Sequence, residues 1–350
     1  MKIVITGVAG FIGGHAAVAF LRQGDVIIGI DNLSRRGNAQ NVAWLNTEAT
    51  KSKGQMHFVH ADIRSSVDMN GVFAAHPDAD AVLHLAGQVA VTTSVANPRL
   101  DFEANALGTL NVLEAVRQFC PSAVLLYSST NKVYGGLEQV TVTERNRRYG
   151  YRDLPGGVPE TMPLDFHSPY GCSKGAGDQY VRDYARIYGL KTVVLRQSCI
   201  YGTRQFGIED QGWVAWFTIA TVLGKNITLY GDGKQVRDVL WVEDLIGLYR
   251  LCIENGDMVA GKVFNAGGGP DFSMSLLELL GFLSELSGRK IEPRQADWRP
   301  GDQRCFIADI ARANTELGWR PTVTPAEGVE KLWEWTHGNE AMLRSVLGDL

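Results

Sequence analysis

The first residues of the chain constrain its fold more than any other stretch. They are MKIVITGVAGFIG, in which a short run of β-branched residues leads to Gly7, Gly10 and Gly13, and a helix-like segment follows from His15 to Gln23. Glycines let the backbone approach a pyrophosphate, and the N-terminus of the next helix supplies N–H donors and a partial positive charge. A strand, a glycine turn and a helix in this order predict a dinucleotide-binding unit.

A second predicted strand, 26–30, ends in Asp31, about 20 residues beyond the glycines. A carboxylate in this position accepts hydrogen bonds from ribose hydroxyls and repels a 2′-phosphate, so NAD is favoured over NADP. Arg35 and Arg36 follow closely and weaken this preference, because arginines bind such a phosphate well.

Strand-like and helix-like segments continue to alternate through the first half of the chain. Further strands are predicted at 56–60, 81–87, 123–127 and 192–196, with a helix at 105–119. The alternation predicts an α/β fold, a Rossmann-type doubly wound parallel sheet with a smaller C-terminal substrate lobe. We place the sheet domain at 1–196 plus about 238–268, and the lobe at about 197–237 plus 269–350.

The carboxyl ends of parallel strands form the ligand crevice of such a sheet. We therefore expect Asp62-Ile63 and Leu85-Ala86-Gly87, which end the third and fourth strands, to lie along the dinucleotide. The next segment, Gln88 to Ser94, is rich in amides and hydroxyls. It either faces a sugar or forms a capped loop that leads into the next helix.

Two later motifs carry the groups that hydride chemistry at a sugar carbinol needs. The strand 123–127 runs into the hydroxyl-rich stretch Ser128-Ser129-Thr130. The pair Ser168-Pro169 predicts a helix start, with Ser168 as N-cap, and that helix carries Tyr170 and Lys174 one turn apart.

A tyrosine with a pKa of about 10 is a poor base. A nearby ammonium and a positive nicotinamide both favour its phenolate, so we expect a lowered pKa for Tyr170. Lys174 supplies the ammonium and can anchor the nicotinamide ribose, while Thr130 can orient the substrate oxygen.

The composition excludes several classes of partner. The net charge of −4 gives no field that attracts nucleic acid or anionic membrane, and no apolar run approaches the roughly 20 residues of a membrane span. The five cysteines are scattered without a CxxC, which argues against a disulfide framework or a zinc site, so no metal is predicted. Because the chain starts in a strand rather than a secretory signal, we expect a cytoplasmic protein.

The stretch 136–167 is long, polar and rich in turn residues. It carries four arginines: Arg145, Arg147, Arg148 and Arg152. Loops of this length in a compact domain are usually functional. The arginines either meet a diphosphate or a neighbouring subunit, or they belong to a solvated loop.

Four motifs carry a resemblance to a known family. They are SSTNKVYG (128–135), LDFHSPYGCSKG (164–175), RQSCIYGTRQFG (196–207) and DQGWVAWF (210–217). With the N-terminal glycines, they make nearly the whole chain resemble extended short-chain dehydrogenases/reductases of the nucleotide-sugar class. Within that class it is most similar to the CDP-paratose 2-epimerase (CDP-tyvelose epimerase) group.

The resemblance implies bound NAD, a CDP-sugar substrate, catalysis by Thr130, Tyr170 and Lys174, and a homo-oligomer, either a dimer or a tetramer. The cofactor-binding residues that it implies are Gly7, Gly10, Phe11, Ile12, Gly13, Asp31, Asn32, Ser34, Arg35, Asp62, Ile63, Leu85, Ala86, Gly87, Asn105, Ser128, Tyr170, Lys174 and Ser198. The substrate-binding residues that it implies are Gln88, Thr93, Thr130, Cys199, Arg204, Gln205, Gln211, Arg237, Arg299 and Asp302. Arg237 and the Arg299–Asp302 pair are expected to hold the nucleotide diphosphate and its ribose.

The activity implied is a redox-neutral epimerisation of a CDP-hexose at C2, an isomerase reaction of the EC 5.1.3 type. Tyr170 takes the proton of the C2 hydroxyl while hydride leaves C2. The 2-keto sugar then turns over, and hydride returns to its other face.

Three other functions compete with this expectation. Sugar 4,6-dehydratases of the class carry Asp-Glu after the catalytic threonine, whereas Asn131-Lys132 stands here, which argues against dehydration. UDP-hexose 4-epimerases share the Ser/Thr, Tyr and Lys, so they remain the main alternative. A non-catalytic NAD-sensing protein is expected to have lost Tyr170 or Lys174, and both are present.

Overall fold

The structure is a computed structural model that describes residues 1–299 and 302–348. Its contacts divide the chain into two compact units. Unit 1 comprises Met1–Val133, Phe166–Arg196 and Ile246–Phe264, and unit 2 comprises Tyr134–Asp165, Gln197–Leu245 and the described residues from Asn265 onward.

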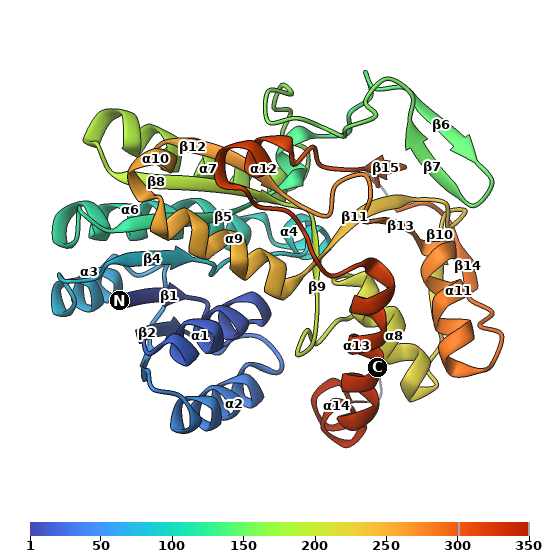
Figure 1. The fold of residues 1–350 in the computed structure, drawn as a ribbon, viewed down its shortest axis with the longest axis horizontal. Coiled ribbons are helices and arrows are strands. Elements are labelled where there is room, and N and C mark those ends of the chain that lie inside the picture. The colour runs from blue at the N-terminus through green and yellow to red at the C-terminus, as the bar shows by residue number, and fades with distance from the viewer. Residues whose placement is uncertain (300–301, 349–350) are drawn as a thin grey trace. The chain divides into compact units, whose positions relative to one another are not determined.

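A seven-stranded sheet forms the centre of unit 1, with helices on both faces (Figure 1). Its strands are β1 (Lys2–Thr6), β2 (Val26–Asp31), β3 (Gln55–His60), β4 (Ala81–His84), β5 (Val124–Thr130), β8 (Lys191–Gln197) and β12 (Lys262–Ala266). They lie in the order β12-β8-β5-β4-β1-β2-β3, and the neighbours from β5 to β3 pair in parallel. The predicted α/β Rossmann-type sheet is therefore confirmed.

The helical elements of this part of the chain connect successive strands. They are α1 (Phe11–Gln23), α2 (Asn38–Lys51), α3 (Ser66–Ala75), α4 (Val91–Ala96), α5 (Pro98–Phe102), the π-helical turn η1 (Glu103–Leu107), α6 (Gly108–Phe119), the 3₁₀ turn η2 (Asn131–Tyr134), α7 (Ser168–Tyr188), α9 (Val242–Glu254) and α10 (Gly256–Val259).

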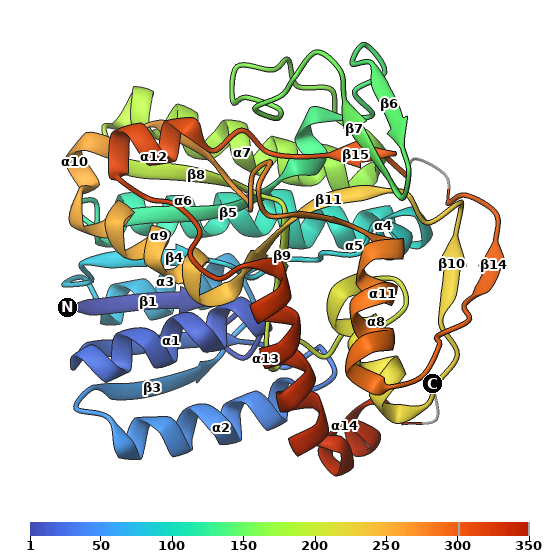
Figure 2. The same cartoon turned by 45° about the vertical axis from the view of Figure 1, so that its right-hand side comes forward.

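Alternate side chains of each strand point to opposite faces of the sheet, so both faces need apolar cover. On one face the strands pack against α3, α6 and α7, in a buried cluster that includes Val4, Val82, Leu125, Phe73, Val112 and Val181. Figures 1 and 2 show α1 and α9 along the other face. The carboxyl ends of the strands stay uncovered by this packing, and the candidate site lies there.

Two of the element boundaries that differ from the sequence prediction have local reasons. Strand β4 ends at His84 rather than Gly87, because the N–H groups of Leu85 and Ala86 turn to the carbonyl and hydroxyl of Thr6, at 3.2 Å. The helix predicted from residue 105 starts as the π-helical turn η1, in which Asn105 is buried. Turns of this kind are frequent at functional sites.

Unit 2 combines short sheets with a helical layer. Its strands are β6 (Val142–Arg145), β7 (Arg148–Tyr151), β9 (Cys199–Tyr201), β10 (Thr228–Tyr230), β11 (Val236–Trp241), β13 (Ser273–Ser275), β14 (Arg294–Ala296) and β15 (Cys305–Phe306). Its helices are α8 (Trp213–Leu223), α11 (Leu276–Ser287), α12 (Ala311–Leu317), α13 (Pro325–Gly338) and α14 (Glu340–Leu347). Strand β11 pairs with β9, β13 and β15, and α8, α11, α13 and α14 contribute to one buried apolar cluster.

Residues 136–165 of the long polar stretch belong to unit 2, although the sequence division placed them in the first domain. They contain the hairpin β6–β7, whose Tyr149 N–H donates to the carbonyl of Lys234 at 2.9 Å. The hydroxyl of Tyr151 donates to the carbonyl of Cys305, also at 2.9 Å. These bonds tie the stretch to the strands of unit 2.

Among the helices that the structure describes, none is both long enough and apolar enough to cross a membrane.

A buried ion pair joins α7 to the sheet of unit 1. Asp178 is fully buried, and its two carboxylate oxygens accept hydrogen bonds from the Arg196 guanidinium on β8 at 2.9 and 3.0 Å. The hydroxyl of Ser129 on β5 donates to the same carboxylate at 2.8 Å. Because both charges are withdrawn from water, each depends on its partner for compensation.

We therefore expect Arg196→Met to lower the free energy of unfolding by about 3–5 kcal/mol, since it leaves the Asp178 charge buried without a partner. Urea unfolding followed by circular dichroism measures the change. Arg117→Met is the control, because Arg117 pairs with Glu114 at the surface, where ion pairs contribute little. Equal losses in the two variants would contradict the prediction.

Candidate active site

The glycine turn after β1 has no room for side chains. Gly7 has φ +74°, and a Cβ there would lie 2.8 Å from the backbone nitrogen of Ala86. A Cβ on Gly13 would lie 2.1 Å from the carbonyl oxygen of Gly7. The N-cap of α1 is Gly10, which makes no side-chain cap, so N–H groups of the first turn are not taken by a capping side chain. This geometry suits a pyrophosphate at the helix N-terminus.

Asp31 is held at the carboxyl end of β2 by three hydrogen bonds. Its carboxylate accepts from the N–H of Ala9 at 3.0 Å, the N–H of Leu33 at 2.8 Å and the Asn38 amide at 3.0 Å. A carboxylate offers about four acceptor positions. The buried Asp31 is thus oriented in advance, and an acceptor position remains for a ribose hydroxyl.

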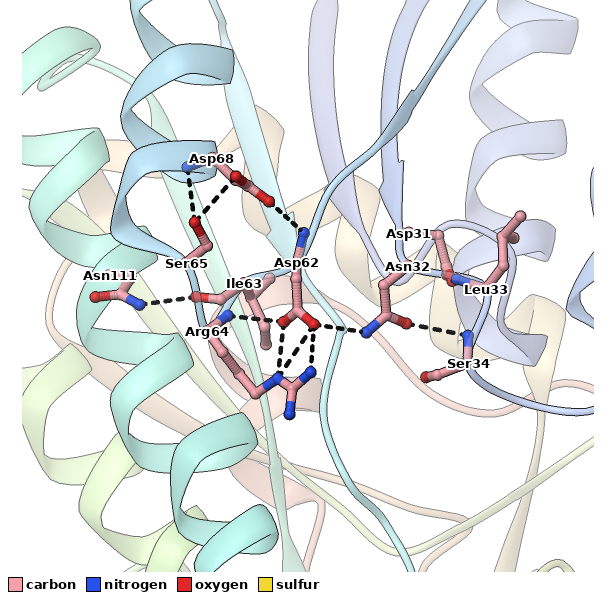
Figure 3. Close-up of polar contacts among 10 residues, drawn as sticks. All are labelled: Asp31, Asn32, Leu33, Ser34, Asp62, Ile63, Arg64, Ser65, Asp68 and Asn111. Atoms are coloured by element: carbon pink, nitrogen blue, oxygen red, sulfur yellow. Dashed lines mark hydrogen bonds and ion pairs between the residues drawn. The ribbon is translucent and has the colours of Figure 1, made fainter.

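Asp62 and Asn32 join the loops after β3 and β2 (Figure 3). The Asn32 amide donates to Asp62 at 3.0 Å, and the Arg64 guanidinium donates to it at 2.7–3.1 Å. These bonds from Arg64 lower the pKa of Asp62 to about 2, so the carboxylate stays ionised. Ile63 is held by the Asn111 amide, which donates to its carbonyl at 2.9 Å. Arg64 was missed from the sequence, although its position two residues after Asp62 suits such a turn.

The three candidate catalytic residues come together in unit 1. Thr130 ends β5, and Tyr170 and Lys174 lie one turn apart on α7, all less than one-tenth exposed. The Thr130 hydroxyl lies close enough to the Tyr170 phenol to lower the pKa of that phenol. The Thr130 hydroxyl also accepts from the N–H of Lys132 at 3.3 Å, which orients it. Helix α7 begins one residue earlier than predicted, with His167 rather than Ser168 as its N-cap, and the Ser168 hydroxyl accepts from the N–H of Gly171 at 3.3 Å.

The acidity of Tyr170 differs from the sequence expectation. Burial raises the pKa of Tyr170, and this effect outweighs the hydrogen bond from Thr130 and the charge of Arg35, which both lower the pKa. Burial also lowers the pKa of the Lys174 ammonium, to about 7, against the opposing charges of Asp101 and Asp178. The expected lowering of the Tyr170 pKa by Lys174 is therefore not found.

Lys174 contacts an aromatic ring and lies above the strand ends. Its Nζ lies 4.3 Å from the centroid of the Tyr127 ring. A Cβ built on Gly87 would lie 3.9 Å from that Nζ and 2.7 Å from Oδ1 of Asn105. Gly87 therefore lies between the amide of Asn105 and the ammonium of Lys174, where a cofactor ribose is expected to approach.

Other residues predicted for this unit lie at or near the same edge. Gln88 turns inward, because its amide donates to Ala90 and Asp101 at 2.8 Å and accepts from the N–H of Ala90 at 2.5 Å. Thr93 is exposed on α4, and Ser128 is half-buried near the end of β5. Residues 88–90 lead into α4, whose N-cap Ala90 makes no side-chain cap, so the predicted capped loop is not found. Gln88 as a sugar ligand remains a prediction.

The predicted diphosphate ligands of unit 2 are arginines with carboxylate partners. Arg237 pairs with Asp302 at 2.7 Å. Arg299 pairs with Asp210 at 3.1 Å, rather than with Asp302, and its guanidinium lies 4.0 Å from the centroid of the Tyr230 ring. Tyr230 was missed from the sequence, where a lone aromatic before a glycine turn carries no specific signal.

The remaining predicted residues of unit 2 surround β9 and the start of α8. The Ser198 hydroxyl donates to Asp238, and the Cys199 sulfur accepts from the Trp213 indole at 3.4 Å. The Gln205 amide donates to the carbonyl of Ile200 at 3.3 Å. Arg204 has φ +58°, and Gln211 forms a bridge with Ile208.

Two of the four loop arginines have a structural role inside unit 2. Arg147 donates to the carbonyl of Leu277, and Arg148 donates to the hydroxyl of Ser273. Arg152 pairs with its neighbour Asp153 at the surface. The prediction that these arginines meet a diphosphate or another subunit gains no support from these contacts.

Comparison with known proteins agrees with this geometry. The family described as GDP-mannose 4,6 dehydratase matches residues 4–332. CDP-paratose 2-epimerase of Salmonella typhi is 48% identical over 341 residues, which cover 96% of this chain and 99% of that protein. A putative UDP-glucose 4-epimerase of Methanocaldococcus jannaschii is 32% identical, again over 96% of this chain and 99% of its own.

The similar proteins of known structure are also nucleotide-sugar epimerases and dehydratases. A UDP-glucose 4-epimerase of Thermotoga maritima, determined with UDP-glucose, has a TM-score of 0.82 at 32% identity and covers 98% of this chain and 100% of its own. A dTDP-glucose 4,6-dehydratase of Streptomyces venezuelae, determined with NAD, has a TM-score of 0.82 at 28% identity, over 99% of this chain and 100% of its own. The chain belongs to the GDP-mannose 4,6 dehydratase family of extended short-chain dehydrogenases/reductases.

Proposed function

We propose that this protein is an NAD-dependent epimerase that inverts C2 of a CDP-hexose, in a reaction of the CDP-paratose to CDP-tyvelose type. The observation that carries the chemistry is the buried trio of Thr130, Tyr170 and Lys174, in which Thr130 lowers the pKa of the Tyr170 phenol. Support for a CDP-sugar and for C2 comes from the 48% identity to a CDP-paratose 2-epimerase.

The residues around the glycine turn fit a dinucleotide. Gly7 and Gly13 have no side chain that would block the approach of a ligand to the backbone. Asp31 is oriented to accept a hydrogen bond from a ribose hydroxyl, and the Lys174 ammonium lies near Gly87. NAD, when bound there, accepts a hydride from the sugar and returns it. The relatives determined with NAD support this choice of cofactor.

In the proposed mechanism, Thr130 orients the C2 hydroxyl and Tyr170, as phenolate, takes its proton. The Thr130 hydroxyl and the charge of Arg35 favour the phenolate, because both lower the Tyr170 pKa, and the Lys174 ammonium would hold the nicotinamide ribose. Tyr170 returns its proton to the oxygen after the keto sugar has turned over, and its raised pKa favours that return. The reaction therefore needs no net exchange of protons with water.

The two arginines of unit 2 are proposed to anchor the nucleotide diphosphate while the hexose turns. Guanidinium groups suit this task because they donate in a planar fork. The ion pairs of Arg237 with Asp302 and of Arg299 with Asp210 restrict the two side chains beforehand. Arg237 binds Oδ1 of Asp302, and Oδ2 of the same carboxylate is proposed to accept from the nucleotide ribose.

A UDP-hexose 4-epimerase is the second candidate, supported by relatives of that name at 32% identity. Relatives named dTDP-glucose 4,6-dehydratases are similar to the same degree, but the residues beside the threonine argue against that activity. Dehydration needs an acid and a base beside the threonine, whereas Asn131 and Lys132 stand there, and Asn131 is buried with its amide oxygen 3.4 Å from Thr130.

We further propose a cytoplasmic homo-oligomer, dimer or tetramer. Several large apolar side chains of unit 1 are exposed on α4, α5 and α7, namely Val95, Phe102, Tyr180, Ile187 and Tyr188. A patch of this kind is typical of an interface between subunits, and sedimentation equilibrium gives the mass that checks it.

Gly13→Ala tests the cofactor site. The added Cβ has no space beside the carbonyl of Gly7, so we expect loss of the NAD that the purified wild-type protein is predicted to carry. The cofactor released by denaturation is measured by its absorbance. Gly71→Ala is the control, because nothing lies within 4 Å of its Cβ position. Retention of NAD by Gly13→Ala would contradict the site.

Tyr170→Phe tests the catalytic phenol. We expect turnover to fall by about 100- to 10,000-fold with NAD still bound, because the proton acceptor is removed and the shape is kept. The matched control is Tyr184→Phe on the same helix, whose hydroxyl donates to Glu114 at 2.7 Å. Full activity in Tyr170→Phe would refute the mechanism.

A substrate panel in deuterated water tests the reaction itself. CDP-, UDP- and GDP-hexoses are incubated with the enzyme and the products are identified by NMR. We expect inversion at C2 of a CDP-hexose without deuterium at C2, because hydride returns internally. Inversion at C4 would favour the second candidate, and deuterium at the inverted carbon would indicate proton abstraction in place of hydride transfer.

A further inference from the structure

A second buried carboxylate lies beside the candidate catalytic helix, and neither the sequence motifs nor the proposed mechanism uses it. Asp101 on α5 has no solvent-exposed surface. Its Oδ1 accepts from the Gln88 amide at 2.8 Å and from the Asn105 amide at 3.1 Å. Its Oδ2 accepts from the hydroxyl of Ser173, the residue that precedes Lys174. A carboxylate that accepts at both oxygens has the pattern of an ionised group.

The partners of Asp101 are neutral. This distinguishes it from Asp178, the other buried carboxylate near Lys174, whose charge is matched by Arg196. Across residues 1–299 and 302–348, no cationic side chain makes a hydrogen bond or ion pair with Asp101. A buried anion that is solvated only by neutral donors needs a cation nearby.

Lys174 is the cation that fits this requirement. Ser173 and Asn105, both bonded to Asp101, bond to each other at 3.1 Å. Oδ1 of Asn105 and Nζ of Lys174 lie 2.7 and 3.9 Å from the position of a Cβ built on Gly87. The charge of Asp101 raises the pKa of Lys174, and among the opposing influences on that pKa it is the largest.

The other titratable groups around Lys174 do not supply a competing charge. His84 on β4 is fully buried and its pKa is lowered to about 3, so its ring is neutral. Burial raises the pKa of Tyr127 on β5, whose ring lies under the ammonium, so its phenol is neutral as well. Asp178, one turn further along α7, also raises the Lys174 pKa, but its own charge is matched by Arg196. Asp101 has the larger effect of the two on the Lys174 pKa.

We propose that Asp101 is a positioning residue that keeps the Lys174 ammonium protonated, with Gln88, Asn105 and Ser173 holding the carboxylate ionised. The proposal rests on the catalytic roles assigned above to Tyr170 and Lys174. It explains why the Gln88 amide turns inward, since Gln88 solvates this carboxylate.

The direction of the pH effect follows from the charges. A neutral residue at position 101 removes a charge that raises the pKa of both Lys174 and Tyr170, so both values fall. Activity that requires the ammonium is lost as pH rises through the Lys174 pKa. A lower Lys174 pKa therefore moves the alkaline limb of the pH–activity profile to lower pH. The acid limb, set by the Tyr170 phenol, moves in the same direction.

Asp101→Asn is the test, because it keeps the size and an acceptor oxygen but removes the charge. The NAD-loaded protein is labelled with ¹³Cε-lysine, and the signal of Lys174 is assigned by its absence in Lys174→Met. We expect the Lys174 pKa to fall by about one to three units, and the whole pH profile of kcat/KM to move to lower pH. Asp101→Ser serves as the neutral variant if Asp101→Asn does not fold.

Asp25→Asn is the matched control, since Asp25 is a buried carboxylate of the same unit that pairs with the N-terminal amine. It should leave the Lys174 pKa unchanged. An unchanged Lys174 pKa in folded Asp101→Asn overturns the proposal, even where activity falls, because a purely structural role lowers activity without moving a pKa. Absence of turnover on every nucleotide sugar by the wild-type protein would instead refute the proposed function, while the lysine titration still decides the role of Asp101.

Discussion

The candidate catalytic chemistry of unit 1 depends on the register between α7 and β5, and the buried Asp178–Arg196 pair determines that register. The helix places Tyr170, Lys174 and Asp178 four residues apart on one face. Asp178 is bound by Arg196 on β8 and by Ser129 on β5. These bonds hold α7 against β5, the strand that ends in Thr130. A slip of α7 by one turn would leave two charges buried without partners.

The burial of Tyr170 and Lys174 also opposes the protonation states that the proposed chemistry needs. It raises the pKa of Tyr170 and lowers that of Lys174, so the neutral forms are favoured, whereas phenolate and ammonium are needed. The Thr130 hydrogen bond and the charge of Arg35 act on the tyrosine in the required direction. On the lysine, Asp101 and Asp178 do so. These four residues therefore offset part of the free-energy cost of charging Tyr170 and Lys174 in a buried site.

Much of unit 1 could be predicted from the sequence, because its signals are local. The glycines before α1 leave no room for a Cβ, Asp31 ends β2, and Tyr170 and Lys174 are one helical turn apart. The predictions that failed depended on distant contacts. Residues 136–165 joined unit 2 through Tyr149 and Tyr151, and the acidity of Tyr170 followed burial rather than its spacing from Lys174.

The sequence by itself determined the alternation of strands and helices in unit 1, the glycine turn, the acid at the end of β2 and the spacing of Tyr170 and Lys174 on one helix, because each depends on neighbours within one or two turns of chain. Only the tertiary structure decided which charges face each other. Asp101 pairs with Ser173 and lies 73 positions before Lys174, and Arg299 turns to Asp210 instead of Asp302. Such partners are selected by the burial of polar groups that must be satisfied once the chain is compact, and no local pattern carries that information.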